Sequence, residues 1–276
     1  MWLKKQFQAP IVNLRFLQEG WHCKALYFEC RQRGYVLKIS PYAHPPEREY
    51  WASKTLGTAF KVPFAYGQGY LKPWYWVLQD YCPGTPLPQK HIKNAVPLLL
   101  ALHHRATPLQ RPPAHLWRTH LRGSDFVKAK IRFPERLPPA RWRFLISCLY
   151  AAVDKIPENL ALHWIHGDLK PEHMPWQEGI SGWIDWEAAR PGDWLYDWSS
   201  LAFQYAINSP LQHIRIGLQA ALRQQSDPRA FRARWQSNVY HHGLSLIFAR
   251  AQSNRSITAH LDALERSLAL VDVLVS

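Results

Sequence analysis

The chain has 276 residues, of which 47% are hydrophobic, so it is long enough for one large domain or two lobes around a sizeable core. The four cysteines show no CxxC spacing, which argues against a zinc site or a disulfide framework, and no stretch reaches the roughly 18 apolar residues of a membrane span. We therefore expect a soluble cytoplasmic protein, whose net charge of +14 is compatible with nucleic acid, a membrane surface or an anionic substrate.

The first part of the chain has the pattern of an antiparallel sheet. Residues 11–28 alternate apolar and polar side chains around Gly20, and residues 34–40 (GYVLKIS) continue the alternation. Two more strands are predicted at residues 62–65 and 74–79. These strands predict a β-sheet lobe.

One helix interrupts this sheet, and a turn ends it. Two prolines precede EREYWASKTL, whose apolar residues have helical spacing, so we predict a helix that begins near Glu47. The turn at Pro83 and Gly84 then predicts a boundary between an N-terminal nucleotide-binding lobe, residues 1–83, and a C-terminal catalytic and acceptor-binding lobe, residues 84–276.

Helical periodicity dominates after that turn. The predicted helices cover residues 94–105, 140–156, 214–222, 231–239 and 257–275, and residues 193–206 are predicted to be a turn that runs into another helix. A Pro-rich and Arg-rich connection separates the first two helices, and a short loop–strand unit precedes the turn. The sequence therefore predicts an α+β fold, with an antiparallel β-sheet lobe that carries one main helix and a larger, mostly helical lobe.

Two short motifs carry the chemistry. Residues 166–173 read HGDLKPEH, and residues 183–187 read WIDWE, so Asp185 follows Asp168 by seventeen positions. Phosphoryl transfer needs a carboxylate that orients or deprotonates the acceptor hydroxyl, and a second carboxylate that binds Mg²⁺ between phosphate oxygens. We interpret Asp168 as the base and Asp185 as the metal ligand.

A lysine in the predicted sheet is a candidate for binding the nucleotide phosphates. Lys38 lies near the end of its strand and could reach nucleotide phosphates, while Glu49, in the helix that follows, could pair with it. Taken alone, such a pair is more often a surface ion pair of small value. Together with the two carboxylate motifs, the functional interpretation is the better one.

In order along the chain, EGWHCKALYFECRQRGYVLK, HGDLKPEH and WIDWEAARPGDWLYDW resemble the aminoglycoside phosphotransferase and choline kinase family, over roughly residues 13–208. The resemblance implies a bilobal protein-kinase-like fold with ATP in the interlobe cleft. It also implies transfer of the γ-phosphoryl group to a hydroxyl of a small molecule, with ATP and Mg²⁺ as cofactors.

The resemblance also implies roles for single residues. Asp168 matches the catalytic aspartate, with Lys170 placed to touch the γ-phosphate, and Asp185 matches the metal-binding aspartate. Lys38 and Glu49 match the ion pair of the N-terminal lobe.

Further matches concern the nucleotide and the catalytic loop. Gln79, Asp80 and Tyr81 match the hinge, whose backbone would bind adenine. Gly20 is a single glycine where protein kinases have a glycine-rich loop. Asp197 matches an aspartate that braces the catalytic loop in this fold.

His173 departs from the family pattern, which usually has Asn at this second metal-binding position. Imidazole suits softer ions better than Mg²⁺, so His173 could shift the metal preference toward Mn²⁺. Because some relatives, notably macrolide-type phosphotransferases, resemble this chain in having His there, we favour an active enzyme. The alternative is a catalytically weak or inactive kinase-like protein that binds nucleotide or nucleic acid.

Charge patterning bears on the acceptor. Residues 105–143 contain ten Lys or Arg and two acids, and residues 210–276 contain four acids in total. A polycationic aminoglycoside would need acidic side chains around it, so we predict a neutral or anionic hydroxyl compound instead.

The basic stretch has two other interpretations. It can be a solvated surface, which is the commoner outcome for charge runs. Because Trp117 and Trp142 lie among the arginines, it also suits a polynucleotide, although the absence of a recognised nucleic-acid module disfavours this. We interpret His103, His104 and His166 as packing or loop-bracing residues.

Overall fold

The computed structural model describes residues 7–19, 23–104, 114–123, 137–208, 211–224, 230–253 and 255–275. Packing groups the chain into two compact units. The N-terminal unit comprises Met1–Leu87 and Glu172–Ala189, and the C-terminal unit comprises Pro88–Pro171 and Arg190–Ser276. The predicted boundary between residues 83 and 84 stays a prediction, whereas packing assigns residues 172–189 to the N-terminal unit. The predicted α+β class is confirmed.

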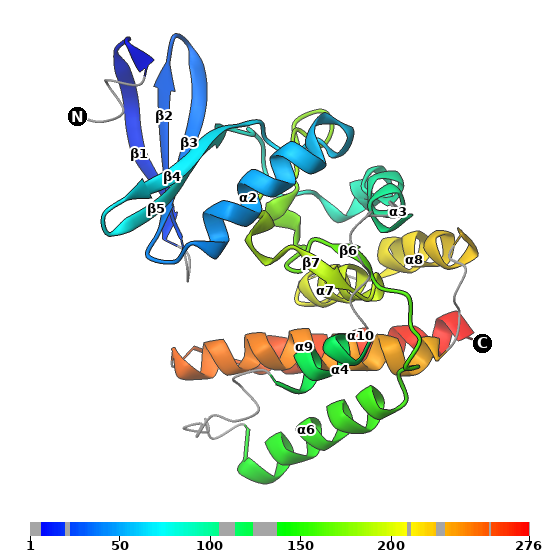
Figure 1. The fold of residues 1–276 in the computed structure, drawn as a ribbon. Coiled ribbons are helices and arrows are strands. Elements are labelled where there is room, and N and C mark those ends of the chain that lie inside the picture. The colour runs from blue at the N-terminus through cyan, green and yellow to red at the C-terminus, as the bar shows by residue number, and fades with distance from the viewer. Residues whose placement is uncertain are drawn as a thin grey trace. The chain divides into compact units, whose positions relative to one another are not determined.

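The N-terminal unit is built on a five-stranded antiparallel sheet, drawn in blue and cyan in Figure 1. Its strands in spatial order are β1 (Ile11–Glu19), β2 (Lys24–Cys30), β3 (Arg33–Ser40), β5 (Trp74–Asp80) and β4 (Ala65–Leu71). Phe28, Cys30, Leu37 and Leu78 form an apolar cluster on the three central strands. Side chains two residues apart on a strand share a face, which explains why the alternating sequence pattern identified this sheet.

The main helix of this unit, α2 (His44–Thr55), begins three residues before the predicted start at Glu47. Pro45 and Pro46 lie inside its first turn, where the missing N–H of proline costs no helical hydrogen bond. The helix contacts β3, β4 and β5, and the backbone N–H of Ala65 donates to Ser53 Oγ at 2.7 Å. The helix is thereby fixed against the sheet.

The strand predicted at residues 62–65 is wrong, because β4 covers Ala65–Leu71 instead. Gly67 and Gly69 obscured it, since glycine in a strand has no side chain to pack and usually signals a turn. The structure gives Gly69 a reason: a Cβ there would lie 3.0 Å from the ring of Trp76 on β5. The glycine leaves room for the indole.

Residues 172–189 join the N-terminal unit through the turn after β5. Thr85 and Trp176 form an isolated antiparallel bridge, with Trp176 N–H donating to Thr85 O at 2.7 Å. Gly84 has φ of +137°, and a Cβ there would meet the Trp176 backbone at 2.7 Å. Only glycine fits both the conformation and this close approach.

The C-terminal unit is mostly helical. Among its described residues, the helices include η2 (Gln89–Asn94), α3 (Val96–His104), α4 (Ala114–Arg122), α6 (Pro139–Asp154), α7 (Leu195–Ala206), α8 (Gln212–Gln224), α9 (Phe231–Gln252) and α10 (Thr258–Val275). Helix α9 packs against α6, α7 and α10, and Trp198, Phe203 and Trp235 are fully buried in this core. No helix in the described part of the chain is both long and apolar enough to cross a membrane.

Helix α4 was not predicted, because prolines and arginines on both sides of it resemble a connection. It is amphipathic all the same, with Trp117 and Leu121 buried four residues apart on one face.

Two short strands position the catalytic-looking motif in this unit. β6 (His163–Ile165) and β7 (Arg190–Gly192) pair antiparallel, with Ile165 opposite Arg190. The HGD sequence follows β6 directly, and α7 begins shortly after β7. This ladder therefore fixes the start of the loop that carries Asp168.

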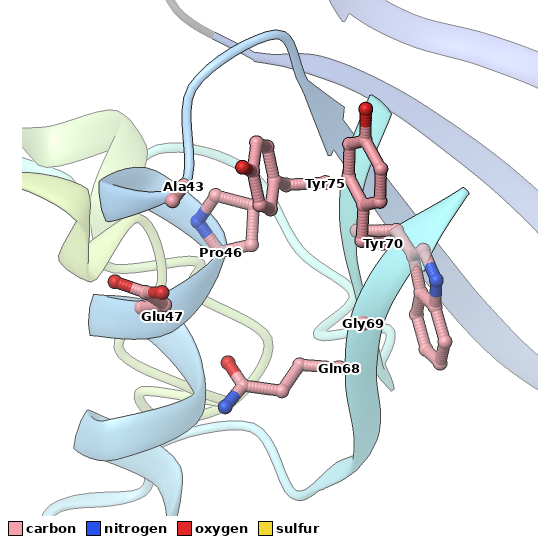
Figure 2. Close-up of a pocket in the computed structure, with 8 residues that line it drawn as sticks. Ala43, Pro46, Glu47, Gln68, Gly69, Tyr70 and Tyr75 are labelled. Carbon is pink, nitrogen blue, oxygen red and sulfur yellow. The ribbon is translucent and has the colours of Figure 1, made fainter. Parts of the chain in front are cut away.

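One pocket of about 290 Å³ opens in the N-terminal unit, between the start of α2 and the β4–β5 hairpin. Figure 2 shows Gln68 extending from β4 toward α2, and Tyr75 beside Pro46. None of the described residues that we predicted for nucleotide or metal binding lines it. We assign the pocket no part in the chemistry.

Candidate functional site

Three predicted residues meet in the N-terminal unit. Lys38 on β3 is 7% exposed, and its Nζ contacts the carboxylates of Glu49 on α2 and Asp185. The distance from Lys38 Nζ to Asp185 Oδ1 is 2.6 Å. Because a buried ammonium is stable only when it is paired, both carboxylates help to keep the lysine charged.

This arrangement shifts the pKa values of Lys38 and Asp185. Burial favours the neutral form of Lys38, but Asp185 and Glu49 outweigh it and raise the pKa of the ammonium group. Burial likewise opposes ionisation of Asp185, but Lys38 and His173 hold the pKa of its carboxyl well below the usual range. At neutral pH the unit presents a fixed cation beside a fixed carboxylate.

Asp185 has a left-handed backbone, with φ of 69° and ψ of 54°, immediately before η4 (Trp186–Ala188). Asp and Asn tolerate this conformation better than most residues, so the sequence at this position suits the turn as well as the chemistry.

The fourth predicted residue of this set is His173, at the end of η3 (Pro171–His173). Its Nε2 lies 2.9 Å from Asp185 Oδ2, and its carbonyl oxygen accepts a hydrogen bond from the N–H of Ile184 at 3.0 Å. Adjacent ligands of an octahedral ion with bonds of about 2.1 Å are about 3 Å apart. The two donor atoms therefore have a separation that fits one divalent ion.

The predicted hinge comprises the last two residues of β5, Gln79 and Asp80, and the residue that follows the strand, Tyr81. Gln79 is buried in the sheet, and Asp80 forms an ion pair with Arg33 at 2.9 Å. The backbone N–H of Asp80 donates to Phe64 O, and that of Tyr81 donates to Gly34 O. Because both N–H groups are used within the unit, adenine recognition here would rely on carbonyl groups or on the next N–H.

One predicted nucleotide-binding residue, Gly20, lies outside the described residues. The structure describes the chain again from Cys23. Burial, followed by the charge of Glu187, raises the pKa of the Cys23 thiol, so it stays protonated near Lys38.

The C-terminal unit holds the other two predicted catalytic residues. Lys170 Nζ lies 3.1 Å from Asp168 Oδ2. The N–H groups of His166 and Gly167 donate to the Asp197 carboxylate at 2.9 and 3.0 Å. Asp197 thus binds the two residues that immediately precede Asp168, and these contacts fit its predicted role as a brace of the catalytic loop.

The sequence interpretation missed a contact of His103, which we had assigned to helix-end packing. Its Nε2 lies 3.2 Å from Asp197 Oδ2, with both side chains fully buried, and its carbonyl oxygen contacts His163 Nδ1 on β6. Burial opposes ionisation of Asp197, but His103 and the Gly167 N–H lower its pKa. Nothing in the apolar run before His103 signals this partner, because it lies 94 positions away.

For the phosphoryl-transfer activity that the sequence motifs predict, we expect the change His103→Ala to reduce kcat about tenfold while leaving the KM for the nucleotide unchanged. The reason is that Asp197 loses a buried partner worth about 1–3 kcal/mol, and the loop that carries Asp168 becomes less well fixed. Steady-state kinetics, with the free energy of unfolding measured in parallel, check this. His213→Ala, an exposed histidine on α8, is the control. Loss of stability with unchanged kcat would limit His103 to a structural role.

A second buried network braces the start of α7. Asp193 and Arg234 are both fully buried, with Arg234 Nη2 2.6 Å from Asp193 Oδ1 and Arg234 Nε 2.9 Å from Asp193 Oδ2. Asn238 Nδ2 adds a contact at 3.3 Å, and the N–H of Leu195 donates to Asp193 at 3.1 Å. The bidentate pair ties α9 to the residues that lead into α7.

The described part of the basic stretch is largely paired. Arg118, Arg122 and Arg141 form ion pairs with Glu158, Asp154 and Glu265 respectively. These pairs neutralise charge at the surface and fit the interpretation as a solvated face.

The two tryptophans of this stretch are not surface aromatics. Trp117 and Trp142 are 2% and 5% exposed. Neither can stack on a base, so the nucleic-acid interpretation loses its aromatic support.

Comparisons with known proteins agree with the fold and the motifs. The profile of the phosphotransferase enzyme family matches residues 13–236. Aminoglycoside phosphotransferase APH(4)-Ia has a similar structure, with a TM-score of 0.73 and 17% identity over 98% of this chain and 96% of that one. A thermostable mutant of that protein has been solved with ADP and hygromycin B.

Two other solved structures are similar. Spectinomycin phosphotransferase APH(9)-Ia, in complex with ADP and spectinomycin, has a TM-score of 0.64 and 15% identity over 99% of this chain and 96% of its own. The microcompartment-associated aminopropanol kinase has a TM-score of 0.63 and 15% identity, covering 94% and 90% of the two chains. A search of curated protein sequences finds no match. At these identities the structural likeness establishes the fold alone.

Proposed function

Because this chain belongs to the phosphotransferase enzyme family, we propose that it transfers the γ-phosphoryl group of ATP to a hydroxyl of a small molecule. The observation that carries the proposal is the buried contact of Lys38 with Glu49 and Asp185, since a protein kinase-like site needs this set to hold nucleotide phosphates. The ADP complexes of two similar structures support ATP as the donor.

The proposed reaction is a direct displacement. The acceptor hydroxyl oxygen forms a bond to the γ-phosphorus, and the bond from that phosphorus to the β,γ-bridging oxygen breaks, with its electron pair leaving on ADP. Asp168 receives the hydroxyl proton. Lys170, which contacts Asp168, offsets the charge of the γ-phosphoryl oxygens, and Lys38 neutralises the nucleotide phosphates.

A divalent ion belongs to this reaction, and Asp185 with His173 would hold it. When bound, Mg²⁺ or Mn²⁺ neutralises charge on the phosphate oxygens. Asp185 Oδ1 contacts Lys38, and Oδ2 lies 2.9 Å from His173 Nε2, so Oδ2 and the imidazole are the groups that would hold the ion. One carboxylate can thus serve both the lysine and the metal.

We expect His173→Asn to raise the ratio of activity with Mg²⁺ to activity with Mn²⁺ by about tenfold, because an amide oxygen replaces an imidazole nitrogen. Rates at matched concentrations of the two ions, together with direct Mn²⁺ titration of the protein with ADP, check this. His44→Asn, an exposed histidine on α2, is the control. An unchanged ratio would remove His173 from the metal site.

For the acceptor we propose a neutral or anionic hydroxyl compound that is not an aminoglycoside. The support comes from residues 210–276, whose four acids are few for a site that binds a polycation. Similarity to aminoglycoside phosphotransferases at 17% identity concerns the fold and does not transfer their acceptor.

The alternative is a protein of this fold that binds nucleotide without turnover. A screen for ATP consumption over pooled metabolites, with Asp168→Asn as the matched inactive variant, separates the two. Acceptor-dependent ADP release by the natural chain, lost in Asp168→Asn, supports the proposal. Metal-dependent ATP binding without ADP release under Mg²⁺ or Mn²⁺ supports the alternative.

A further inference from the structure

An arginine beside two aromatic rings lies at the start of β7. The guanidinium carbon of Arg190 is 5.4 Å from the ring centroid of Tyr196 and 5.9 Å from that of Trp117. The two rings pack edge to face at 5.3 Å. Cation–π contacts of this kind hold a guanidinium by its face and suit the binding of planar anions along its N–H edge.

Two histidines continue this arrangement. The ring of His120 on α4 stacks on the ring of Trp117, with 5.2 Å between centroids. The ring of His241 on α9 lies 5.1 Å from the ring of His120. His241 Nδ1 is 3.1 Å from the Tyr196 hydroxyl oxygen. Four separate elements, α4, β7, α7 and α9, therefore contribute polar groups to one cluster.

A third histidine, His242, connects the cluster to the loop of Asp168, since its ring lies edge to face with that of Tyr196 at 6.1 Å between centroids. His242 Nε2 lies 3.3 Å from Ser200 Oγ, and that hydroxyl donates to the Leu169 carbonyl at 2.6 Å. Leu169 is the residue after Asp168. The cluster and the proposed base are thus linked within the same compact unit.

The cluster is neutral apart from its arginine. Burial, followed by the charge of Arg190, lowers the pKa of His120 to about 4. Burial also lowers the pKa of His242 to about 4, with Asp168 opposing and Lys170 and Arg190 adding to the shift. Burial, followed by the charges of His120 and Arg190, lowers the pKa of His241 well below its usual range. At neutral pH the imidazoles offer hydrogen bonds and Arg190 supplies positive charge.

We propose that Arg190, assisted by His120 and His242, binds an acidic group of the acceptor, a carboxylate or a phosphate, while the acceptor hydroxyl faces Asp168. The inference deepens the proposed function and rests on it. A guanidinium pairs with both anions through two parallel hydrogen bonds, and neutral imidazoles can add further donors. The same positive charge would repel a polycationic acceptor.

Matched probes test this. Glycerol 3-phosphate and glycerate are compared with glycerol, and glucose 6-phosphate with glucose, by calorimetric titration into the whole chain with Mn²⁺ and a non-hydrolysable ATP analogue. We expect at least one acidic probe to bind ten or more times as tightly as its neutral counterpart, a difference of about 1.4 kcal/mol or more. Arg190→Gln should abolish that preference, and Arg190→Lys should keep only part of it because it lacks the planar fork.

The control is Arg143→Gln, an exposed arginine on α6, which should leave the preference unchanged. If no acidic probe binds better than its neutral counterpart, the inference is overturned. Equal binding of the acidic probe by the natural chain and by folded Arg190→Gln, or by Arg190→Lys if the Gln variant does not fold, overturns it as well.

The two proposals can fail separately. Asp168→Asn should lose turnover but keep the acid preference in binding. Acid preference without ATP turnover in the natural chain would leave the Arg190 site standing and refute the phosphotransferase. ATP turnover with no preference for acidic over neutral acceptors would support the phosphotransferase and refute the Arg190 site.

Discussion

The substitution Asp185→Asn is expected to reduce phosphoryl transfer on the order of 10³-fold, the scale reached when one charge that acts on the transferring phosphoryl group is removed. Asn keeps the size of the side chain and tolerates the left-handed backbone at this position, so the change removes charge and little else. It removes the carboxylate that we propose for the metal and one of the two carboxylates that contact Lys38.

Kinetics at saturating ATP, with calorimetric titration of ADP and metal, check this expectation. Lys38 keeps Glu49 as a partner in the variant, so the lysine should stay charged and the protein should stay folded. Glu47→Gln is the matched control, because it removes an exposed carboxylate from α2 in the same unit. Near-normal transfer by Asp185→Asn would exclude this residue from metal binding.

The largest expected effect on stability comes from Asp193→Ala, at about 3–5 kcal/mol of unfolding free energy. The change leaves the Arg234 guanidinium fully buried without its bidentate carboxylate, and it removes the acceptor for the Leu195 N–H at the start of α7. A buried charge that loses its partner costs far more than the pair contributes when intact. Urea unfolding followed by circular dichroism measures the difference.

An exposed pair on the same helix provides the comparison. Arg232 and Asp272 form an ion pair between α9 and α10, with side chains 53% and 61% exposed. Asp272→Ala should therefore cost less than about 1 kcal/mol. If Asp193→Ala lowers the free energy of unfolding no more than Asp272→Ala does, the buried network contributes no more to stability than the exposed pair, and the prediction is wrong.

The sequence predicted well whatever depends on short-range pattern. Alternation identified the strands around β2 and β3, and apolar periodicity identified α7, α9 and α10. The motif residues Lys38, Glu49, Asp185 and His173 come together in the N-terminal unit. The pattern defines the strand of Lys38 and the helix of Glu49, whereas the motifs themselves, and no periodicity, identified Asp185 and His173. Their roles in catalysis stay predictions.

Other features could not be read from local pattern. The predicted position of β4 was wrong because its glycines, Gly67 and Gly69, indicate a turn in the sequence. In the structure they leave room for the ring of Trp76 on the neighbouring strand, which local pattern does not reveal. α4 was hidden by the prolines and arginines around it. The roles that we infer for His103 and Arg190 depend on contacts with residues distant in the sequence. His103 contacts Asp197. Arg190 contacts the rings of Trp117 and Tyr196.

The central claim is that this chain moves a phosphoryl group to a small-molecule hydroxyl. The most direct measurement incubates the protein with ATP, Mn²⁺ or Mg²⁺ and pooled metabolites, and then identifies by mass spectrometry any metabolite that gains one phosphoryl group. We predict a phosphorylated product and an equal amount of ADP with the natural chain, and neither with Asp168→Asn. Absence of any such product with both ions, despite metal-dependent binding of ATP, would contradict the claim.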